Sequence, residues 1–324
     1  MSSPFDGYEV AAALRPQAQA CRFDLDEALS AVVALEAKVP EDALTALSLG
    51  TERLGNGTVI GPNGLVLTMG YLVTEAEEVI LTRNDGTRVP AHVLGVDQVT
   101  GLALVQALEP LELPAMPLGD SRELPPGSEV ILAGGGGRAH AVAGHILARL
   151  PFAGYWEYLL EEAIFAGPAH PHWSGAALIG PTGELVGVGS LTLQGQTRQG
   201  PQPINMFVPI ELLPPILDDL ARGKPRDTAR PWLGVLAQEV GPHVVVVGVS
   251  PRGPASRAEL RAGDVIMAVD QVPVTTLAEF YTRLWALGPA GVTVPLTIQR
   301  DGDVFDVEVR SRDRAALLRK PKYN

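Results

Sequence analysis

Short apolar runs separated by glycine- and proline-rich turns recur along most of this chain, and this pattern constrains the fold more than any other feature. The 324 residues include 35 Gly and 28 Pro. The stretch Gly61-Pro62-Asn63-Gly64 illustrates the turn chemistry, because Pro fixes one corner and Gly takes positive φ at little cost. Such a pattern favours many short strands over long helices, so the sequence predicts a mainly β protein.

Two groups of β-strands are expected before residue 222. The first group is expected at residues 31–36, 57–60, 65–68, 78–82, 88–96 and 102–106. The second is expected at residues 129–133, 141–149, 177–179, 185–190 and 204–208, with a closing helix over 211–221. The regular spacing indicates an all-β barrel followed by a second β unit.

The last third of the chain follows a different pattern. A charged stretch at 222–227 interrupts all periodicity and predicts a linker. Beyond it we expect strands at 244–249, 264–269, 292–300 and 303–309, with helices over 254–259 and 276–287. The predicted division is an N-terminal segment (1–30), a β domain (31–222), a linker (223–230), a β-rich domain with two helices (231–311) and a tail (312–324).

The charge balance argues against nucleic-acid binding. The chain has 25 Lys+Arg against 37 Asp+Glu, a net charge of -12, and therefore repels phosphate backbones. The Arg-containing segment 310–322 is interpreted as a solvated terminus. Cys21 is the only cysteine, so neither an intrachain disulfide nor a thiolate metal cluster is expected.

The sequence also bears on the compartment. It holds no apolar run long enough for a transmembrane helix, and its first residues lack the basic and apolar regions of a secretory leader. We therefore expect a cytoplasmic protein without a membrane span. The alternative is the periplasm, if a processed leader is missing from this sequence.

Trp232-Leu233-Gly234-Val235 opens the C-terminal domain just before a strand-like stretch. Because Gly allows unusual dihedrals and close approach, such a loop can expose consecutive backbone N–H groups. Exposed N–H groups form a nest for a peptide carboxylate, and a following edge strand can pair with the incoming chain. The loop therefore predicts a peptide-binding site.

The segment that follows carries a family resemblance. Ser250-Pro251-Arg252-Gly253-Pro254-Ala255 and, further on, Gly263-Asp264-Val265-Ile266 resemble the PDZ domains of bacterial HtrA-type proteins over about 231–311. One departure is Glu259, where the family has glycine in Ala-Gly-Leu. The resemblance implies a carboxylate-binding loop at residues 232–235 and a helix flanking the groove, with Leu277, Phe280 and Leu284 as candidate binding residues. In the opposing interpretation Trp232 only packs at the linker and the neighbouring domain blocks the groove.

A Ser-Gly pair marks the candidate nucleophile of the larger domain. Ser174 lies on a loop before a strand, where an acyl-transfer nucleophile would sit. Together with segments 55–73, 97–105, 117–121 and 204–209, this region resembles the trypsin-like protease domain of the HtrA family over roughly 31–222. The resemblance implies a trypsin-like double β-barrel followed by the PDZ domain, and the two-domain order is more specific than any single motif.

The same resemblance identifies what the catalytic site lacks. The family's His follows a Thr-x-x motif, which here reads Thr68-Met69-Gly70-Tyr71, so Tyr71 occupies the His position. The family's Asp lies in Thr-Asp-Leu-Ala, which here reads Thr100-Gly101-Leu102-Ala103, so Gly101 replaces the carboxylate. Ser174 needs both an imidazole and a carboxylate to act, and a phenol with a reference pKa of about 10 is a poor general base.

Other residues near Ser174 complete the prediction for this site. His172 stands at the oxyanion position, where the family has glycine, and its Cβ can keep the N–H from facing an oxyanion. His170 and His172 are also considered as substitute bases, although loop neighbours rarely point at each other. The remaining histidines lack metal-ligand spacing, and Gly134-Gly135-Gly136-Gly137 lacks the Lys-Ser/Thr of a phosphate loop. No metal and no cofactor are expected.

These observations predict an HtrA-like pseudoprotease that binds extended or C-terminal peptide segments as an adaptor, sensor or holdase in protein quality control. The alternative is an active serine endopeptidase that uses Ser174 with a non-standard base. A third interpretation is a structural subunit of a mixed oligomer with an active paralogue. The expected partners are peptide or protein C-termini and unfolded segments, and the family resemblance implies a homotrimer.

Overall fold

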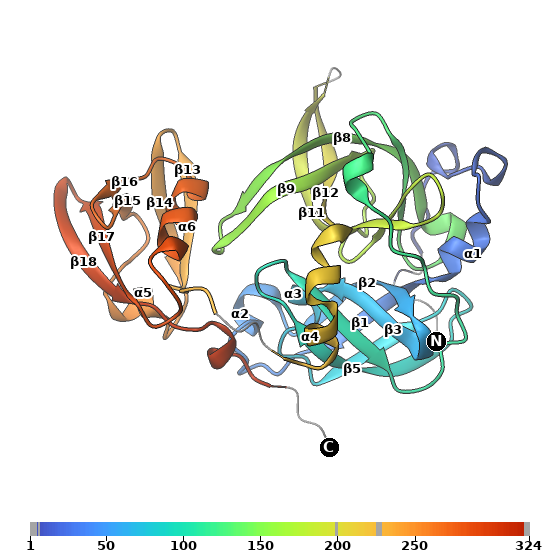
Figure 1. Cartoon of the computed structure of the whole chain (residues 1–324), viewed down its shortest axis with the longest axis horizontal. Helices are drawn as coiled ribbons and strands as arrows, with labels where there is room; N and C mark the ends of the chain where they lie inside the picture. The colour runs from blue at the N-terminus through green and yellow to red at the C-terminus, as the bar shows by residue number, and fades with distance from the viewer. Residues whose placement is uncertain (1–4, 6, 198–199, 225–228, 321–324) are drawn as a thin grey trace. The chain divides into compact units, whose positions relative to one another are not determined.

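The computed structural model describes residues 5, 7–197, 200–224 and 229–320 (Figure 1). The chain divides into two compact units: Met1–Leu150, Glu162–Pro225 and Leu318–Asn324 form the first, and Pro151–Glu161 and Arg226–Leu317 form the second. A short segment from within the predicted β domain therefore belongs to the second unit. The boundaries drawn from the sequence stay a prediction. Residues 225–228 of the proposed linker, and parts of both terminal segments, lie outside the described residues.

Six strands close into a first barrel in the order β1-β2-β3-β6-β5-β4 (Figure 1). They are β1 (Val32–Lys38), β2 (Glu52–Gly61), β3 (Leu65–Met69), β4 (Glu78–Thr82), β5 (Arg88–Val96) and β6 (Leu102–Ala107). Each lies at or near a strand expected from the sequence, because the turns between them are specified locally. A short helix, α3 (Gly70–Val73), leaves the end of β3 directly and carries Tyr71.

Six further strands close into a second barrel in the order β10-β11-β12-β9-β8-β7. They are β7 (Glu129–Ala133), β8 (Ala141–Gly154), β9 (Tyr158–Gly167), β10 (Ala177–Ile179), β11 (Leu185–Thr197) and β12 (Gly200–Pro209). The sequence did not predict β9. Its stretch Leu159-Leu160-Glu161-Glu162 lacks polar–apolar alternation and is rich in helix formers. The place of β9 between β8 and β12 in the barrel overrides that local preference.

The core of the second barrel explains why its strands close. Apolar side chains from β7 to β12 meet inside it, and they include Val130, Leu132, Val142, Ile146, Ile164, Leu178, Val186 and Phe207. At about 25 cal/mol per Å² of buried apolar area, a fully buried side chain of this size contributes about 2 kcal/mol. The loop that carries Ser174 joins β9 to β10, so this core positions both of its ends.

The helix predicted over residues 211–221 is not one continuous helix. The chain instead forms two 3₁₀ turns, η6 (Ile210–Leu212) and η7 (Pro214–Ile216), and then α4 (Leu217–Ala221). Pro214 and Pro215 lack an N–H, so two hydrogen bonds of a continuous α-helix cannot form here. The other short helical elements of this unit are η1 (Ala12–Leu14), η2 (Ala18–Ala20), α1 (Leu25–Ser30), α2 (Ala46–Leu49), η3 (Pro62–Gly64), η4 (Ser121–Glu123) and η5 (Gly137–His140).

The second unit contains one sheet and two helices. The strand order is β13-β14-β15-β17-β18, and β16 pairs with β15. The elements are β13 (Val235–Val240), β14 (His243–Val249), α5 (Pro254–Arg257), β15 (Val265–Val269), β16 (Val272–Pro273), α6 (Leu277–Ala286), β17 (Thr293–Arg300), β18 (Asp303–Arg310) and η8 (Ala315–Leu317). A capping box between Thr276 and Glu279 starts α6. Because β13 ends this strand order, its outer edge is not paired with another strand of this sheet.

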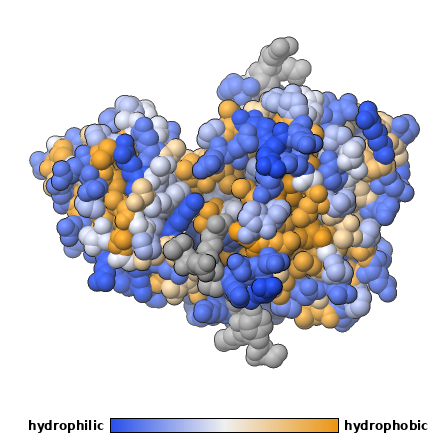
Figure 2. Space-filling view, viewed as in Figure 1, coloured by the Kyte–Doolittle hydropathy of each residue, from blue (hydrophilic) through white to orange (hydrophobic). Residues whose placement is uncertain are grey.

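The surfaces of both units mix apolar and hydrophilic residues. On the face shown in Figure 2, apolar residues remain visible between hydrophilic ones on both units. Within the described ranges, no helix has the length and apolar character needed to cross a membrane.

Candidate active site and peptide groove

Ser174 lies in a tight turn that requires glycine at the next position. The Ala176 N–H donates to the Trp173 carbonyl across 3.0 Å, and the Gly175 N–H donates to the Gly189 carbonyl across 2.8 Å. Gly175 has a φ of +71°, and a Cβ built on it would lie 2.0 Å from the carbonyl oxygen of Asn56. A larger residue would clash with backbone, so the turn that presents Ser174 depends on this glycine.

The structure brings Tyr71 and Ser174 together. The Tyr71 hydroxyl and Ser174 Oγ lie 2.5 Å apart, and the Tyr71 hydroxyl also donates to the Ser190 carbonyl across 3.0 Å. A phenol has one proton, and a carbonyl can only accept. With that proton given to Ser190, the Ser174 hydroxyl is the donor in the short contact. Burial raises the pKa of the Tyr71 phenol above its ordinary value, so the phenol is neutral at physiological pH and cannot serve as a base.

Gly101 provides no carboxylate to this site. Its carbonyl accepts from the Gly70 N–H across 2.6 Å, which fixes the start of the turn that carries Tyr71. Its φ is +78°, a conformation that glycine adopts without strain. The nearby carboxylate of Asp97 accepts from the Thr100 N–H at 2.8 Å and from the Thr100 hydroxyl at 2.7 Å. The Asp97 carboxylate therefore stabilises the turn from Asp97 to Thr100.

His170 is fully buried and uses both ring nitrogens. Nδ1 accepts from the His172 N–H at 3.0 Å, so Nε2 carries the proton and donates to the His140 carbonyl at 2.8 Å. Burial lowers the pKa of His170 to about 4. The ring is therefore neutral at physiological pH. Because its one lone pair already accepts a hydrogen bond, it is not available as a base for Ser174.

His172 forms hydrogen bonds through its backbone and aromatic contacts through its ring. Its N–H, which the family resemblance assigns to the oxyanion position, donates to His170, and its carbonyl accepts from the Asn56 side-chain amide at 2.7 Å. Its ring centroid lies 4.3 Å from that of Phe5 and 5.1 Å from that of Tyr8. Burial lowers the pKa of His172 as well. The N–H that would stabilise an oxyanion is thus directed at an imidazole.

Asn56 organises this loop, and the sequence did not single it out. Its side-chain N–H₂ donates to the carbonyls of His172 at 2.7 Å and Ser174 at 3.0 Å, while its oxygen accepts from the Gly135 N–H at 2.9 Å. Asn56 is fully buried on β2, where an asparagine is uncommon. That unusual residue type directly before the expected strand 57–60 was the available signal.

Three of the four residues of the predicted carboxylate nest direct their N–H groups at one carboxylate of the same chain. The N–H groups of Leu233, Gly234 and Val235 all donate to the side-chain carboxylate of Glu157, at 3.0, 2.6 and 2.9 Å. The Trp232 N–H does not take part, because it donates to the Arg312 carbonyl at 3.0 Å. The peptide-binding role of Trp232 stays a prediction.

The helix expected beside the groove contributes a residue that the sequence did not identify. Phe280 and Leu284 are fully buried and Leu277 nearly so, and all three belong to the core of the second unit. Tyr281 belongs to the same core, and its hydroxyl in addition donates to the Gly154 carbonyl at 2.7 Å. Tyr281 follows Phe280 on α6, and the two neighbours are both buried, so nothing in the sequence singled out the residue that carries the hydroxyl.

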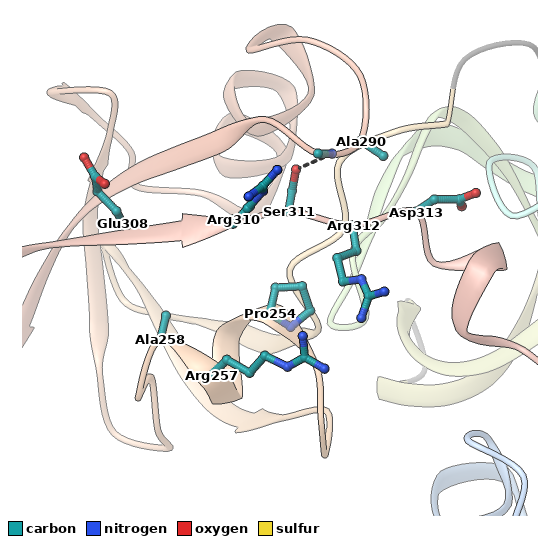
Figure 3. A pocket seen from close by; sticks show the side chains of 10 residues that line it. Pro254, Arg257, Ala258, Ala290, Glu308, Arg310, Ser311, Arg312 and Asp313 are labelled. Atoms are coloured by element: carbon teal, nitrogen blue, oxygen red, sulfur yellow. Dashed lines mark hydrogen bonds between the residues drawn. The ribbon is translucent and has the colours of Figure 1, made fainter.

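A separate hollow of about 700 Å³ in the second unit has a different lining (Figure 3). Its polar lining includes Arg257 from α5 and Arg312 from the chain after β18, and none of the predicted peptide-binding residues lines it. Among the described residues, no group of three or more His, Cys, Asp or Glu could hold a metal ion.

Two protein families match the sequence. Residues 55–188 match the "Trypsin-like peptidase domain" and residues 231–310 match the "PDZ domain". The "Probable periplasmic serine endoprotease DegP-like" of Pseudomonas fulva (strain 12-X) is 31% identical over 270 residues, which cover 78% of this chain and 54% of that protein. "Serine endoprotease DegS" of Escherichia coli (strain K12) is 25% identical over 280 residues, which cover 81% of this chain and 78% of that protein.

The match to solved structures concerns the fold. The structure of "HtrA-type protease AlgW with decapeptide" has a TM-score of 0.52 and 23% identity, covering 92% of this chain and 98% of that one. Together with the two family matches, it confirms the predicted mainly β fold, a trypsin-like double β-barrel followed by a PDZ domain. The chain spans about half the length of the DegP-like relatives that it matches.

Proposed function

Because the chain belongs to the HtrA-type family, in which a trypsin-like peptidase domain is followed by a PDZ domain, we propose that it is a pseudoprotease that binds extended or C-terminal peptide segments without cleaving them. The hydroxyl–hydroxyl contact between Tyr71 and Ser174 carries this proposal. In this proposal the Tyr71 phenol takes the place of the imidazole that would accept the serine proton.

The chemistry of that contact opposes acyl transfer. The Ser174 proton points at a phenol oxygen, and protonating a neutral phenol is unfavourable at any physiological pH. Gly101 offers no carboxylate to stabilise a cation at the base position. The members of a catalytic triad act as a unit, so hydrolysis is expected at or near the uncatalysed background. The engaged N–H of His172 removes one oxyanion donor as well, a loss of about 10²–10³ in rate on its own.

The second unit supports peptide binding. Three consecutive N–H groups converge on one carboxylate, and the adjoining β13 is an edge strand. This combination is the one used for capture of a terminal carboxylate with strand addition. The related AlgW structure is described with a decapeptide, which supports the same ligand class here.

A turnover assay separates this function from the alternative, an active serine endopeptidase. The purified protein and its Ser174→Ala variant are incubated with unfolded casein, and each is treated with a fluorophosphonate probe that labels activated serines. We expect the same background casein cleavage from both and no labelling of Ser174, with trypsin as the positive control. Cleavage that disappears in the Ser174→Ala variant would establish the endopeptidase, as the names of the DegP-like and DegS relatives suggest.

A second assay tests the binding half of the proposal. A fluorescein-labelled pool of decapeptides with random C-terminal residues is titrated as free acids and as C-terminal amides. We expect the free acids to bind at least tenfold more tightly, because an amide cannot offer a carboxylate to the three N–H groups. Equal affinity for both pools would contradict the carboxylate nest.

The cellular setting is part of the same proposal. The DegP-like relatives are described as probable periplasmic proteins, which favours the periplasm over the cytoplasm that the sequence first suggested. An adaptor, sensor or holdase role fits a binding module beside an inert peptidase domain. A homotrimer or a mixed oligomer with an active relative would allow such a chain to regulate proteolysis. Cell fractionation and analytical ultracentrifugation test these two points.

A further inference from the structure

The proposed peptide groove already holds a segment of the same chain. The turn between β8 and β9, residues Gly154–Tyr158, belongs to the same compact unit as the PDZ domain. At its tip Glu157 is 9% exposed, and its carboxylate accepts from the N–H groups of the nest at distances down to 2.6 Å. A terminal carboxylate of a bound peptide would need the same donors.

The backbone of this turn follows the edge of the sheet. Two residues before Glu157, the Tyr155 carbonyl accepts from the Ala237 N–H across 2.9 Å. Ala237 lies on β13, whose other edge pairs with β14. The turn therefore lies on the free edge of β13, where an incoming peptide would add as a strand.

The helix α6 holds the turn from a third side. The Tyr281 hydroxyl donates to the Gly154 carbonyl at 2.7 Å and accepts from the Glu157 N–H at 3.2 Å. The flanking Ala153 and Leu159 contact the core of the unit. Glu157 itself has a φ of +60°, so the backbone turns back toward β9 while its side chain enters the nest. The nest, the edge strand and the helix thus all contact the same few residues.

We propose that the β8–β9 turn is an internal ligand of the PDZ domain, that Glu157 substitutes for the terminal carboxylate of a peptide, and that an external peptide binds by displacing it. This inference rests on the peptide binding proposed above. It adds a regulation of that site: the groove opens only when the turn leaves. The class of competing partner is a chain with a free C-terminal carboxylate in extended conformation.

The chemistry of Glu157 suits an occupant that can be displaced. Burial raises the pKa of its carboxyl to about 7, so removing this carboxylate from water opposes the hydrogen bonds that hold it. In water a peptide α-carboxyl has a reference pKa of about 3.5, below the 4.5 of a glutamate side chain, so in the same nest it loses its proton more readily. An external terminus can therefore supply a carboxylate to the same N–H groups while Glu157 returns to solvent.

Amide hydrogen exchange tests the internal ligand without any external peptide. The segment 232–237 is followed by mass spectrometry in the wild-type protein and in the Glu157→Ala variant. We expect exchange at least tenfold faster in the variant, because the N–H groups of the nest lose their acceptor. The Tyr281→Phe variant, which keeps the carboxylate but removes the hydroxyl that holds the turn, is expected to give an intermediate rate. The matched control is Glu161→Gln, an exposed acid on β9. Exchange that is unchanged in Glu157→Ala would overturn the inference.

Peptide titration then tests displacement. The free-acid decapeptide pool described above is expected to bind Glu157→Ala at least tenfold more tightly than the wild-type protein or Glu161→Gln, and near-ultraviolet circular dichroism checks that each variant is folded. Equal affinity for all three proteins would contradict the internal ligand and leave the binding function standing. Absence of binding to all three, with fast exchange in Glu157→Ala, would contradict the binding function and leave the contact with Glu157 as a purely structural one, which also overturns the regulatory inference.

Discussion

The backbone N–H of His172 donates to Nδ1 of His170 across 3.0 Å. Through this bond a buried neutral imidazole occupies the donor that a serine protease would aim at its oxyanion. The loss of hydrolysis proposed here therefore has two sources that are separate in space, the phenol at Tyr71 and the amide at His172. Restoring one of them leaves the other in place.

A variant with a rebuilt triad tests this separation. In Tyr71→His/Gly101→Asp we expect casein turnover to remain within about tenfold of background, because the oxyanion donor is still engaged and position 101 has a φ of +78°. Adding His170→Ala and His172→Gly releases the N–H and is expected to raise turnover by about 10² relative to the double variant. The rate of casein cleavage is measured with enzyme in excess over substrate. A double variant as active as the quadruple one would show that the amide is irrelevant.

Removing the Tyr71 hydroxyl should change stability rather than activity. In Tyr71→Phe the Ser190 carbonyl and the Ser174 hydroxyl both lose a partner in a half-buried setting, so the free energy of unfolding should fall by about 1 kcal/mol. Urea denaturation measures the change, and background casein cleavage should stay the same. The control is Tyr8→Phe, whose parent residue is 41% exposed. Increased labelling of Ser174 by fluorophosphonate in Tyr71→Phe would show that the phenol restrains an otherwise reactive serine.

His170 should make stability depend on pH. Its pKa is about 4 in the folded protein against 6.5 in the reference state, so the unfolded chain binds more protons between these values. Stability is then complete above about pH 6.5 and is lost as the pH falls toward 4, by an amount on the order of 3 kcal/mol. Urea unfolding at several pH values measures this slope. In His170→Gln the protein should be less stable at pH 7 and the slope shallower, and an unchanged slope would assign the effect to other groups.

Asn56 is expected to be the most sensitive position of the serine loop. Asn56→Ala leaves the carbonyls of His172 and Ser174 and the N–H of Gly135 without their side-chain partner, at a cost of about 3 kcal/mol. Asn56→Asp should cost at least as much, because a carboxylate would then face the two carbonyls. Thermal and urea unfolding measure both. Gln202→Ala on β12, an exposed amide, is the control and should change stability by less than about 0.5 kcal/mol. A loss below 1 kcal/mol in Asn56→Ala would contradict the bracing role.

Occupation of the nest by Glu157 should weaken as the pH rises. The pKa of Glu157 is about 7 when it is docked and 4.5 in the reference state, so the docked form binds its proton more tightly. Docking is then strongest below about pH 4.5 and weakens up to about pH 7. The charge of Arg314 opposes this trend by lowering the pKa of Glu157, while Glu239 acts on the neighbouring Tyr281.

Protection of the nest amides measures this effect. After correction for intrinsic exchange rates, the protection factors of Leu233 to Val235 should fall at least tenfold between pH 5 and pH 8 in the wild-type protein. The Glu157→Ala variant should show no such change. A wild-type protection factor that is independent of pH would mean that Glu157 stays ionised throughout.

The sequence predicted those parts of the fold that local chemistry specifies. Turns with Gly, Pro and Asn marked most strands, and the resemblance to HtrA-type proteins, which the family matches confirm, brought Tyr71 and Ser174 to one site before their contact was seen. Strand β9 could not be predicted because its helix-forming composition is overruled by its place between β8 and β12 in the barrel. The contact of Glu157 with Leu233 joins residues 76 apart, and no local pattern reports such a pairing.

Strands β8 and β9 join the tip that carries Glu157 to the rest of the chain on both sides. A tethered competitor of this kind acts at an effective concentration in the millimolar range, whatever the amount of protein in the cell. External C-termini at micromolar concentration would then rarely displace the turn from the groove. A large rise in the concentration of damaged polypeptides would displace it. The groove would therefore bind external peptides only above a threshold concentration of exposed C-termini.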